Sequence, residues 1–142
     1  GKVAGQVGAG PIVKVLYEES AESVFHILNR LFLAIDYQRY PVRDEASLRA
    51  YVQVYFAGAG LEVKVEHHNA HGRSDLVNAG NRHWIFEFKV MQGNKGETEK
   101  LSEAVEQIKQ RHYGDQQYSK EVKKVALVFS IEDRKFVKWQ EV

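Results

Sequence analysis

The sequence predicts an α/β domain, in which helices and strands are mixed along one chain. Three observations lead to this prediction: the length, the composition and the order of the apolar patterns. The chain has 142 residues, of which 44% are hydrophobic and 27% are charged, and these values are typical of one folded domain. The apolar patterns occur in the order helix, helix, three strands, helix and two strands. We therefore expect a single compact domain built around a sheet.

The composition also excludes several classes of protein. The chain has no cysteine, which excludes a disulfide-stapled scaffold and a thiolate zinc site. Its formal net charge of +1 excludes a uniformly basic surface but is compatible with a local basic patch. The longest apolar stretch, 31–35, is far shorter than the ~20 residues that span a bilayer, and the first residues do not resemble an export signal. These features predict a cytoplasmic protein with no membrane segment.

The N-terminal residues, 1–43, predict a tail followed by one amphipathic helix. Residues 1–12 are rich in glycine, which predicts a flexible tail, and a short strand or turn is expected at 12–17. Apolar residues then recur at spacings of three and four as far as Ile35, and Ser20 is placed to be the N-cap of this helix.

The remaining residues, 44–142, predict the core of the domain. Asp44 is expected to cap a second helix that ends at Gly58 or Gly60. Further strand and helix patterns follow in the order strand, strand, strand, helix, strand, strand, over residues 61–66, 74–78, 83–91, 101–108, 124–130 and 136–139.

Two charged residues stand in the most apolar strand pattern of the chain, at 84–90. Side chains alternate between the faces of a sheet, so Glu87 and Lys89 share one face and lie roughly 7 Å apart along the strand. An unpaired buried ion is costly, so these charges need a partner. Metal coordination and mutual pairing would each meet that need, and a structural ion pair on a half-exposed face is the alternative.

Asp75 lies on the preceding strand pattern, and a tight turn at Gly80 joins the two strands into a hairpin. We expect this hairpin to bring Asp75 and Glu87 side by side. Two carboxylates together with a backbone carbonyl, that of Phe88, form the hard oxygen cage that Mg²⁺ prefers. Lys89 would then orient the attacking water or help to deprotonate it. The pattern therefore indicates hydrolysis of a phosphodiester.

A further acid, Glu45, stands in the first turn of the second predicted helix. It lies at the edge of the apolar stripe that this helix turns toward the sheet, and the helix macrodipole favours a carboxylate there. Glu45 is therefore a third candidate acid of the site, and an exposed first-turn glutamate is the alternative.

Two other groups of residues have competing interpretations. Zinc binding by a histidine cluster beside Asp75 is the weaker alternative to a solvated loop; the residues concerned are His67, His68, His71 and His83. Several basic side chains are candidates for contacts to a nucleic-acid backbone or for plain surface charge, namely Arg73, Lys95, Lys120, Lys123 and Lys124.

Asp75 followed by Glu87-Phe88-Lys89 resembles the signature of the PD-(D/E)xK nuclease superfamily, with Ser74 in place of the proline. From about residue 44 to the end, the chain resembles the branch usually found C-terminal to an AAA-ATPase-like domain. The segments that carry this resemblance are Gly72-Arg73-Ser74-Asp75-Leu76-Val77, Ile85-Phe86-Glu87-Phe88-Lys89, Ala104-Val105-Glu106-Gln107-Ile108-Lys109, Tyr113 and Lys123-Lys124-Val125. The chain has no Walker motif, so either an ATPase-like partner domain belongs to sequence that is absent here or this is a stand-alone version.

The resemblance implies a restriction-endonuclease-like fold, with a central mixed sheet of about five strands and helices on both sides. It also implies hydrolysis of phosphodiester bonds, expected in DNA, with Mg²⁺ or Mn²⁺ as the cofactor. Asp75 and Glu87 would bind the metal, Lys89 would be the catalytic lysine, and Glu45 would be the helix-borne acid that holds the metal or its water. The family's downstream Gln and Tyr correspond to Gln107 and Tyr113, which would support the site or contact the substrate, as would Arg73; Glu66 would be a further ligand or a strand-edge partner of Arg73.

Two alternatives from other classes remain open. A catalytically silent module that binds nucleic acid or protein would keep the fold without the chemistry, although it would have no chemical need for Asp75, Glu87 and Lys89 together. The second alternative is a homodimer formed through the amphipathic helix at 20–36, and it is compatible with nuclease activity.

Overall fold

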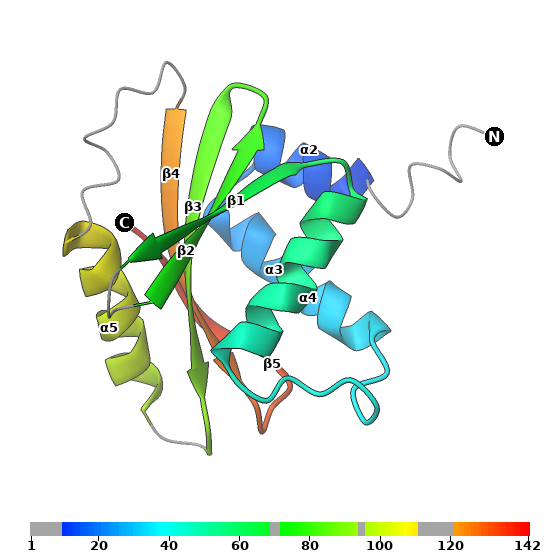
Figure 1. Cartoon of the computed structure of the whole chain (residues 1–142), viewed down its shortest axis with the longest axis vertical. Helices are drawn as coiled ribbons and strands as arrows, with labels where there is room; N and C mark the ends of the chain where they lie inside the picture. Colours follow the sequence, from blue (N-terminus) through cyan, green and yellow to red (C-terminus); the bar gives the residue numbers. More distant parts are fainter. Residues whose placement is uncertain (1–9, 69–71, 94–95, 111–120) are drawn as a thin grey trace.

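The computed structural model describes residues 10–68, 72–93, 96–110 and 121–142. Its centre is one sheet of five strands in the order β1-β2-β3-β4-β5 (Figure 1). All neighbouring strands are antiparallel except β3 and β4, which are parallel. The strands are β1 Glu62–His68, β2 Gly72–Ala79, β3 Arg82–Met91, β4 Glu121–Ser130 and β5 Lys135–Glu141. Residues 1–9 of the predicted tail lie outside the described residues. The same holds for His71, Lys95, Tyr113 and Lys120.

Helices cover both faces of this sheet (Figure 1). On one face lie α2 (Gly10–Glu18), α3 (Ala21–Ala34) and α4 (Glu45–Gly58), and on the other lies α5 (Glu97–Gln110). The helix α5 connects β3 to β4, as a parallel pair of strands requires. The predicted α/β fold, with a five-stranded mixed sheet flanked by helices, is therefore confirmed.

The two faces of the sheet bury cores of different size. Alternation along β3 sends Trp84, Phe86 and Phe88 into the larger core under α2, α3 and α4. The same alternation sends Ile85 into a smaller core, where it packs with residues of α5 such as Ile108. The rings of Trp84 and Phe86 are stacked, with centroids 5.7 Å apart. The strand predicted to be the most apolar is therefore buried on both faces.

The expected strand or turn at 12–17 is wrong, because these residues belong to helix α2. Ile12 and Leu16 are fully buried, and their spacing of four residues places them on one side of a helix. The backbone carbonyl of Leu16 also accepts a hydrogen bond from Trp84 Nε1 at 2.8 Å. The β-branched residues of this segment favour a strand locally, but packing on β3 selects the helix.

The predicted caps of the next two helices are confirmed. Ser20 is the N-cap of α3, and Asp44 forms a capping box with Ser47 at the start of α4. The Ser47 backbone N–H donates to Asp44 Oδ1 at 2.8 Å. This hydrogen bond is the main cause that lowers the pKa of Asp44 below its usual value. The start of α4, and with it the position of Glu45, is therefore well defined.

The apolar face of α3 packs on the sheet. Val24 and Leu28 are fully buried in the larger core. The Asn29 side chain also donates to the Phe136 carbonyl at 3.0 Å and accepts from the Phe136 N–H at 2.7 Å. The face on which the predicted homodimer through 20–36 depends is thus buried within the domain.

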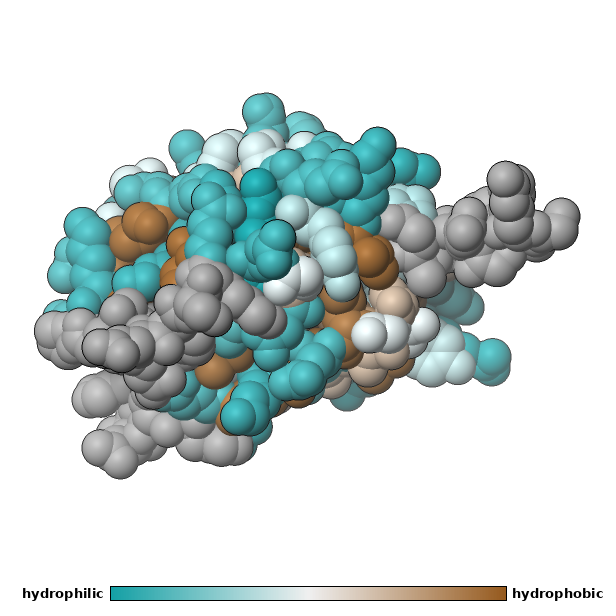
Figure 2. Space-filling view, turned by 90° about the horizontal axis from the view of Figure 1, so that it is seen from above, coloured by the Kyte–Doolittle hydropathy of each residue, from teal (hydrophilic) through white to brown (hydrophobic). Residues whose placement is uncertain are grey.

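Most of the visible surface is polar. Figure 2 shows one face of the molecule, on which hydrophilic residues predominate and hydrophobic ones form small separate patches. The large hydrophobic side chains exposed in the described segments are few: Tyr17, Leu33, Tyr40, Val54 and Val142. Within those segments no helix combines the length and the apolar character that crossing a membrane requires.

Candidate functional site

The sheet opens between β2 and β3 at the predicted site. The ladder between these strands runs from Ala79 opposite Arg82 to Asp75 opposite Phe86. Beyond that point β2 continues beside β1, and β3 continues beside β4 (Figure 1). The predicted carboxylates therefore lie where the hairpin ladder ends.

Asp75 is buried on the face covered by α4. Arg49 donates to it from Nε to Oδ2 at 3.0 Å and from Nη2 to Oδ1 at 3.2 Å. Gln53 adds a third hydrogen bond, from Nε2 to Oδ1 at 2.6 Å. The guanidinium and the carboxylate thus form a bidentate ion pair in which both groups are buried, and such pairs combine charge with fixed geometry.

Glu87 is equally buried but belongs to the other face. It follows Phe86, so it shares its face with Ile85 and with the small core under α5. Ser74 Oγ donates to Glu87 Oε1 at 3.1 Å. The hairpin itself is confirmed, but its register pairs Asp75 with Phe86. The expectation that Asp75 and Glu87 lie side by side is therefore wrong by one position, which in a strand reverses the face.

Lys89 reaches the N-terminal end of α4. Its Nζ lies 4.0 Å from Glu45 Oε2, and the two side chains are 16% and 34% exposed. Glu45 is in the first turn of α4, as predicted, and its side chain is partly buried and not a freely solvated one. The sequence suggested that Lys89 is neutralised at a metal site or by Glu87. In the structure Lys89 pairs with Glu45 instead.

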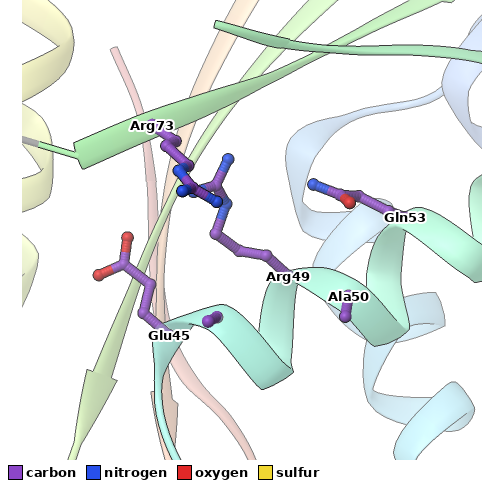
Figure 3. Close-up of a pocket in the computed structure, with 6 residues that line it drawn as sticks. Glu45, Arg49, Ala50, Gln53 and Arg73 are labelled. Carbon is purple, nitrogen blue, oxygen red and sulfur yellow. The ribbon is translucent and has the colours of Figure 1, made fainter. Parts of the chain in front are cut away.

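A pocket of about 440 Å³ lies between α4 and the start of β2 (Figure 3). Figure 3 shows the guanidinium groups of Arg49 and Arg73 pointing toward one another across it, with Glu45 and Gln53 on either side. The residues that line it are Glu45, Ala46, Arg49, Ala50, Gln53 and Arg73. The pocket therefore adjoins Asp75 through Arg49 and Gln53, which contact both.

Sequence reasoning missed Arg49 and Gln53. The signal is present in the sequence, because Glu45, Arg49 and Gln53 follow one another at spacings of four and so share one face of α4. All the polar residues on this face, and not its acid alone, indicate the two partners of Asp75.

The other predicted site residues lie on α5, in the larger core and on the neighbouring strands. Gln107 is half-buried on α5, and within the described part of the chain its Oε1 has no hydrogen-bond partner. The Phe88 side chain packs in the larger core, which leaves only its carbonyl for a ligand role. Glu66 is opposite Ser74 in the β1–β2 ladder, one position from Arg73. Lys123 pairs with Glu141 at 3.4 Å.

The described histidines do not form the loop cluster expected beside Asp75, and His71 lies outside the described residues. His67 and His68 belong to β1 and not to a loop. His83 is at the opposite end of the hairpin, where its Nδ1 lies 2.8 Å from Asn78 Oδ1. Among the residues that the structure describes, no three His, Cys, Asp or Glu side chains gather in a way that could hold a metal ion.

The donors of the predicted magnesium site fit the metal in chemistry but not in arrangement. Asp75, Glu87, Glu45 and the Phe88 carbonyl offer the oxygen atoms that Mg²⁺ and Mn²⁺ prefer. However, both oxygens of Asp75 accept hydrogen bonds from Arg49, and one of them also accepts from Gln53. Asp75 would have to leave Arg49 before its carboxylate could serve a metal.

Comparison with known proteins adds one finding to this geometry. Residues 43–139 match the family model of the PD-(D/E)XK nuclease superfamily, and no curated protein matches the sequence. The match starts at the approach to α4 and includes Glu45, Asp75, Glu87 and Lys89. It covers more than half of the chain, and the fold around these residues has the mixed sheet and flanking helices expected from the motif. The chain belongs to the PD-(D/E)XK nuclease superfamily.

Proposed function

We propose that this protein is a metal-dependent nuclease that hydrolyses phosphodiester bonds, with DNA as the substrate. The observation that carries the proposal is a pair of buried carboxylates, Asp75 and Glu87, at the point where the β2–β3 ladder ends. Buried acids are costly and are concentrated at functional sites. The motif that contains them lies within the region that matches the superfamily.

The residues divide into metal ligands and substrate contacts. Asp75, Glu87 and the Phe88 carbonyl would hold Mg²⁺ or Mn²⁺, with Glu45 holding the metal or its water. Bound there, the metal would stabilise the negative charge that develops on the phosphate. Gln107, Tyr113 and Arg73 are the proposed contacts to the substrate backbone.

Lys89 is the proposed catalytic lysine. It lies on β3 two positions after Glu87 and is only 16% exposed. Its side chain would orient the attacking water or help to deprotonate it. The water oxygen would form a bond to phosphorus while the ester P–O bond breaks, and the proton that the water loses would pass to the departing oxygen. The pair with Glu45 keeps Lys89 at the α4 end of the site.

The test is a cleavage assay with circular and linear DNA in Mg²⁺ and in Mn²⁺. Wild type is compared with Lys89→Ala, Asp75→Ala and Asp75→Asn. The asparagine keeps an oxygen that can accept from Arg49, so a loss of folding can be separated from a loss of chemistry. Metal-dependent cutting that all three substitutions abolish would support the proposal, and cutting of the circle would make the protein an endonuclease. Inert wild type in both metals, with no Asp75-dependent metal binding in calorimetry, would refute it.

A catalytically silent binding module is the second candidate. The observation that favours it is the ion pair of Asp75 with Arg49, which gives the carboxylate a structural role without any metal. In that case wild type binds DNA in a gel-shift assay but cuts it in neither metal. Asp75→Asn would then leave DNA binding unchanged.

An AAA-ATPase-like domain and a second copy of this chain are further proposed partners. The proposed homodimer uses residues 20–36, whose apolar face is buried here, so it would have to use the exposed side of α3, on which Leu33 is 86% exposed. Light scattering at high concentration tests it, and a monomer would rule it out.

A further inference from the structure

The pocket between α4 and the start of β2 has two kinds of polar group in its wall. The guanidinium groups of Arg49 and Arg73 offer N–H donors, and the Glu45 carboxylate offers acceptor oxygens (Figure 3). The exposed Ala46 and Ala50 add only methyl groups. A ligand that fits this wall therefore carries both hydrogen-bond acceptors and donors, together with an apolar surface.

Arg49 is the fixed part of this wall. Its side chain is 7% exposed and is held by Asp75 through Nε and Nη2. A guanidinium has five N–H donors, so its other Nη donors are the ones that a ligand in the pocket can reach. A bidentate ion pair holds its members in one geometry. Arg49 is therefore oriented before a ligand binds, which lowers the entropy cost of binding.

The Glu45 carboxylate disfavours a phosphate as the main ligand of the pocket. Its side chain is 34% exposed and lies 4.0 Å from the ammonium of Lys89. An anion placed beside this carboxylate would be repelled by it. With the ion-pair partners Asp75 and Lys89 included, two carboxylates oppose the three cations of the site. The pocket therefore suits a neutral group, with the single excess positive charge left for one phosphodiester beside it.

Guanine is the nucleic-acid base that matches this pattern of donors and acceptors. Its O6 and N7 atoms accept from a guanidinium fork, which is the commonest specific contact to a base. Its other edge offers two neighbouring donors, N1–H and the N2 amino group, and a carboxylate can accept one with each oxygen. At the same edge, adenine, cytosine and thymine have an acceptor next to the donor. Each of them would therefore leave one carboxylate oxygen facing another acceptor.

We propose that this pocket binds an unpaired guanine of a nucleic-acid strand, with Arg49 donating to O6 and N7 and Glu45 accepting from N1–H and the N2 amino group. Arg73 keeps its proposed contact to the backbone. The guanine is unpaired because Glu45 uses the edge that base pairing would occupy. The inference rests on the proposed function and adds a base preference to its nucleic-acid substrate. A carboxylate has about four lone-pair sites, so Glu45 can accept from the base whether or not it also holds metal-bound water.

The experiment measures how labelled oligothymidines bind the full chain, by fluorescence anisotropy in EDTA so that no strand is cut. Each strand carries one central base, which is guanine, adenine, cytosine, thymine or a guanine analogue. Hypoxanthine lacks the N2 amino group, and 7-deazaguanine lacks N7, so the analogues test each contact without altering the protein. We expect guanine to bind at least about fivefold more tightly than the other three bases. Each analogue should lose part of this preference.

Glu45→Gln and Glu97→Gln form the matched pair of variants. Both glutamates stand in the first turn of a helix and pair with a lysine, which is Lys138 at 3.5 Å for Glu97. Glu45→Gln replaces one acceptor oxygen by a donor, so it should weaken the binding of guanine more than that of hypoxanthine. Glu97→Gln should leave both affinities unchanged. Thermal melts confirm that each variant is folded.

The outcomes separate this inference from the proposed function. Equal affinity for all central bases, in a protein whose wild type cuts DNA, overturns the guanine site and leaves the nuclease proposal intact. A guanine preference in a protein that cuts no DNA supports the guanine site and counts against the nuclease. Equal affinity for guanine and hypoxanthine overturns the contact to Glu45. If deoxyguanosine monophosphate binds as tightly as the strand, the pocket is a free-nucleotide site and its assignment to a strand is wrong. No binding of any strand, together with inert wild type, overturns both proposals.

Discussion

Asp75 and Glu87 are equally buried, at 1% exposed each, but the two faces of the sheet stabilise them in different ways. On the α4 face, Asp75 receives a bidentate cation and an amide. On the α5 face, Glu87 accepts from the hydroxyl of its cross-strand neighbour, Ser74. Asp75 thus accepts hydrogen bonds from side chains of helix α4, whereas Glu87 accepts one from a side chain of strand β2. The difference teaches that a motif of two acids need not be two equivalent ligands.

The largest expected effect comes from removing the cation beside Asp75. Arg49→Met leaves a buried carboxylate without its ion pair, and the loss of one partner of a buried pair costs ~3–5 kcal/mol of unfolding free energy. Urea denaturation measures this loss. Adding Asp75→Leu should recover a large part of it, because an apolar pair of similar volume replaces a buried ion pair without that penalty.

The exposed arginine of the same pocket is the control for this change. Arg73→Met should alter stability by only ~0.5 kcal/mol or less, as surface substitutions usually do. Equal destabilisation by Arg49→Met and Arg73→Met would show that Asp75 does not depend on the buried pair, and the contrast between the two acids would fail.

A smaller effect is expected on the other face. Ser74→Ala removes a hydroxyl that donates to the Glu87 carboxylate, and the loss of such a bond costs ~1–3 kcal/mol. Ser102→Ala on the exposed side of α5 is the control and should cost almost nothing. If Ser74→Ala destabilises the protein as much as Arg49→Met in the same urea assay, then the two acids are held equally strongly.

The pair of Lys89 and Glu45 should separate function from stability. It is partly exposed and long, at 4.0 Å, so Glu45→Gln should cost only ~0–1 kcal/mol. If Glu45 holds the metal or its water, the same change lowers the cleavage rate by ~10–100-fold. Unchanged cleavage, with stability measured in parallel, would reduce Glu45 to a surface partner of Lys89.

The register that separates Asp75 from Glu87 could have been predicted from the turn. A two-residue turn at Gly80 and Asn81 pairs Ala79 with Arg82, and counting back from there places Asp75 opposite Phe86. The turn itself is fixed by Gly80, which has a φ of 61°. A side chain there would also meet the ring of Tyr17, with the added carbon only 2.7 Å from it. The turn therefore contradicts the side-by-side arrangement that the two-acid motif suggests.

Some features of the fold can be predicted from local sequence patterns, and others cannot. The amphipathic spacing predicted α3, α4 and α5, because burial of one stripe and exposure of the other repeats every three to four residues. Helix α2 was missed because its choice between helix and strand depends on Trp84, 68 residues away. In the same way, the ion pair between Arg49 and Asp75 depends on how closely α4 approaches β2. Only the packing of the whole domain determines that distance.

The smallest expected effect is a pH dependence at the start of α4, the helix that carries Arg49. The Ser47 N–H lowers the pKa of Asp44 in the folded protein, so the charged cap stabilises the fold above the ordinary carboxyl pKa. This contribution is lost as the pH falls through the lowered value. Asp44→Asn keeps an acceptor without a titrating charge, so its melting temperature should converge with that of wild type in acid and fall slightly below it at neutral pH. Because Asp44 is fully exposed, the difference is small. If the melting temperatures of both proteins depend on pH in the same way, the charge of Asp44 contributes nothing to the stability of α4. The position of Arg49 beside Asp75 would then depend on packing and on the ion pair alone.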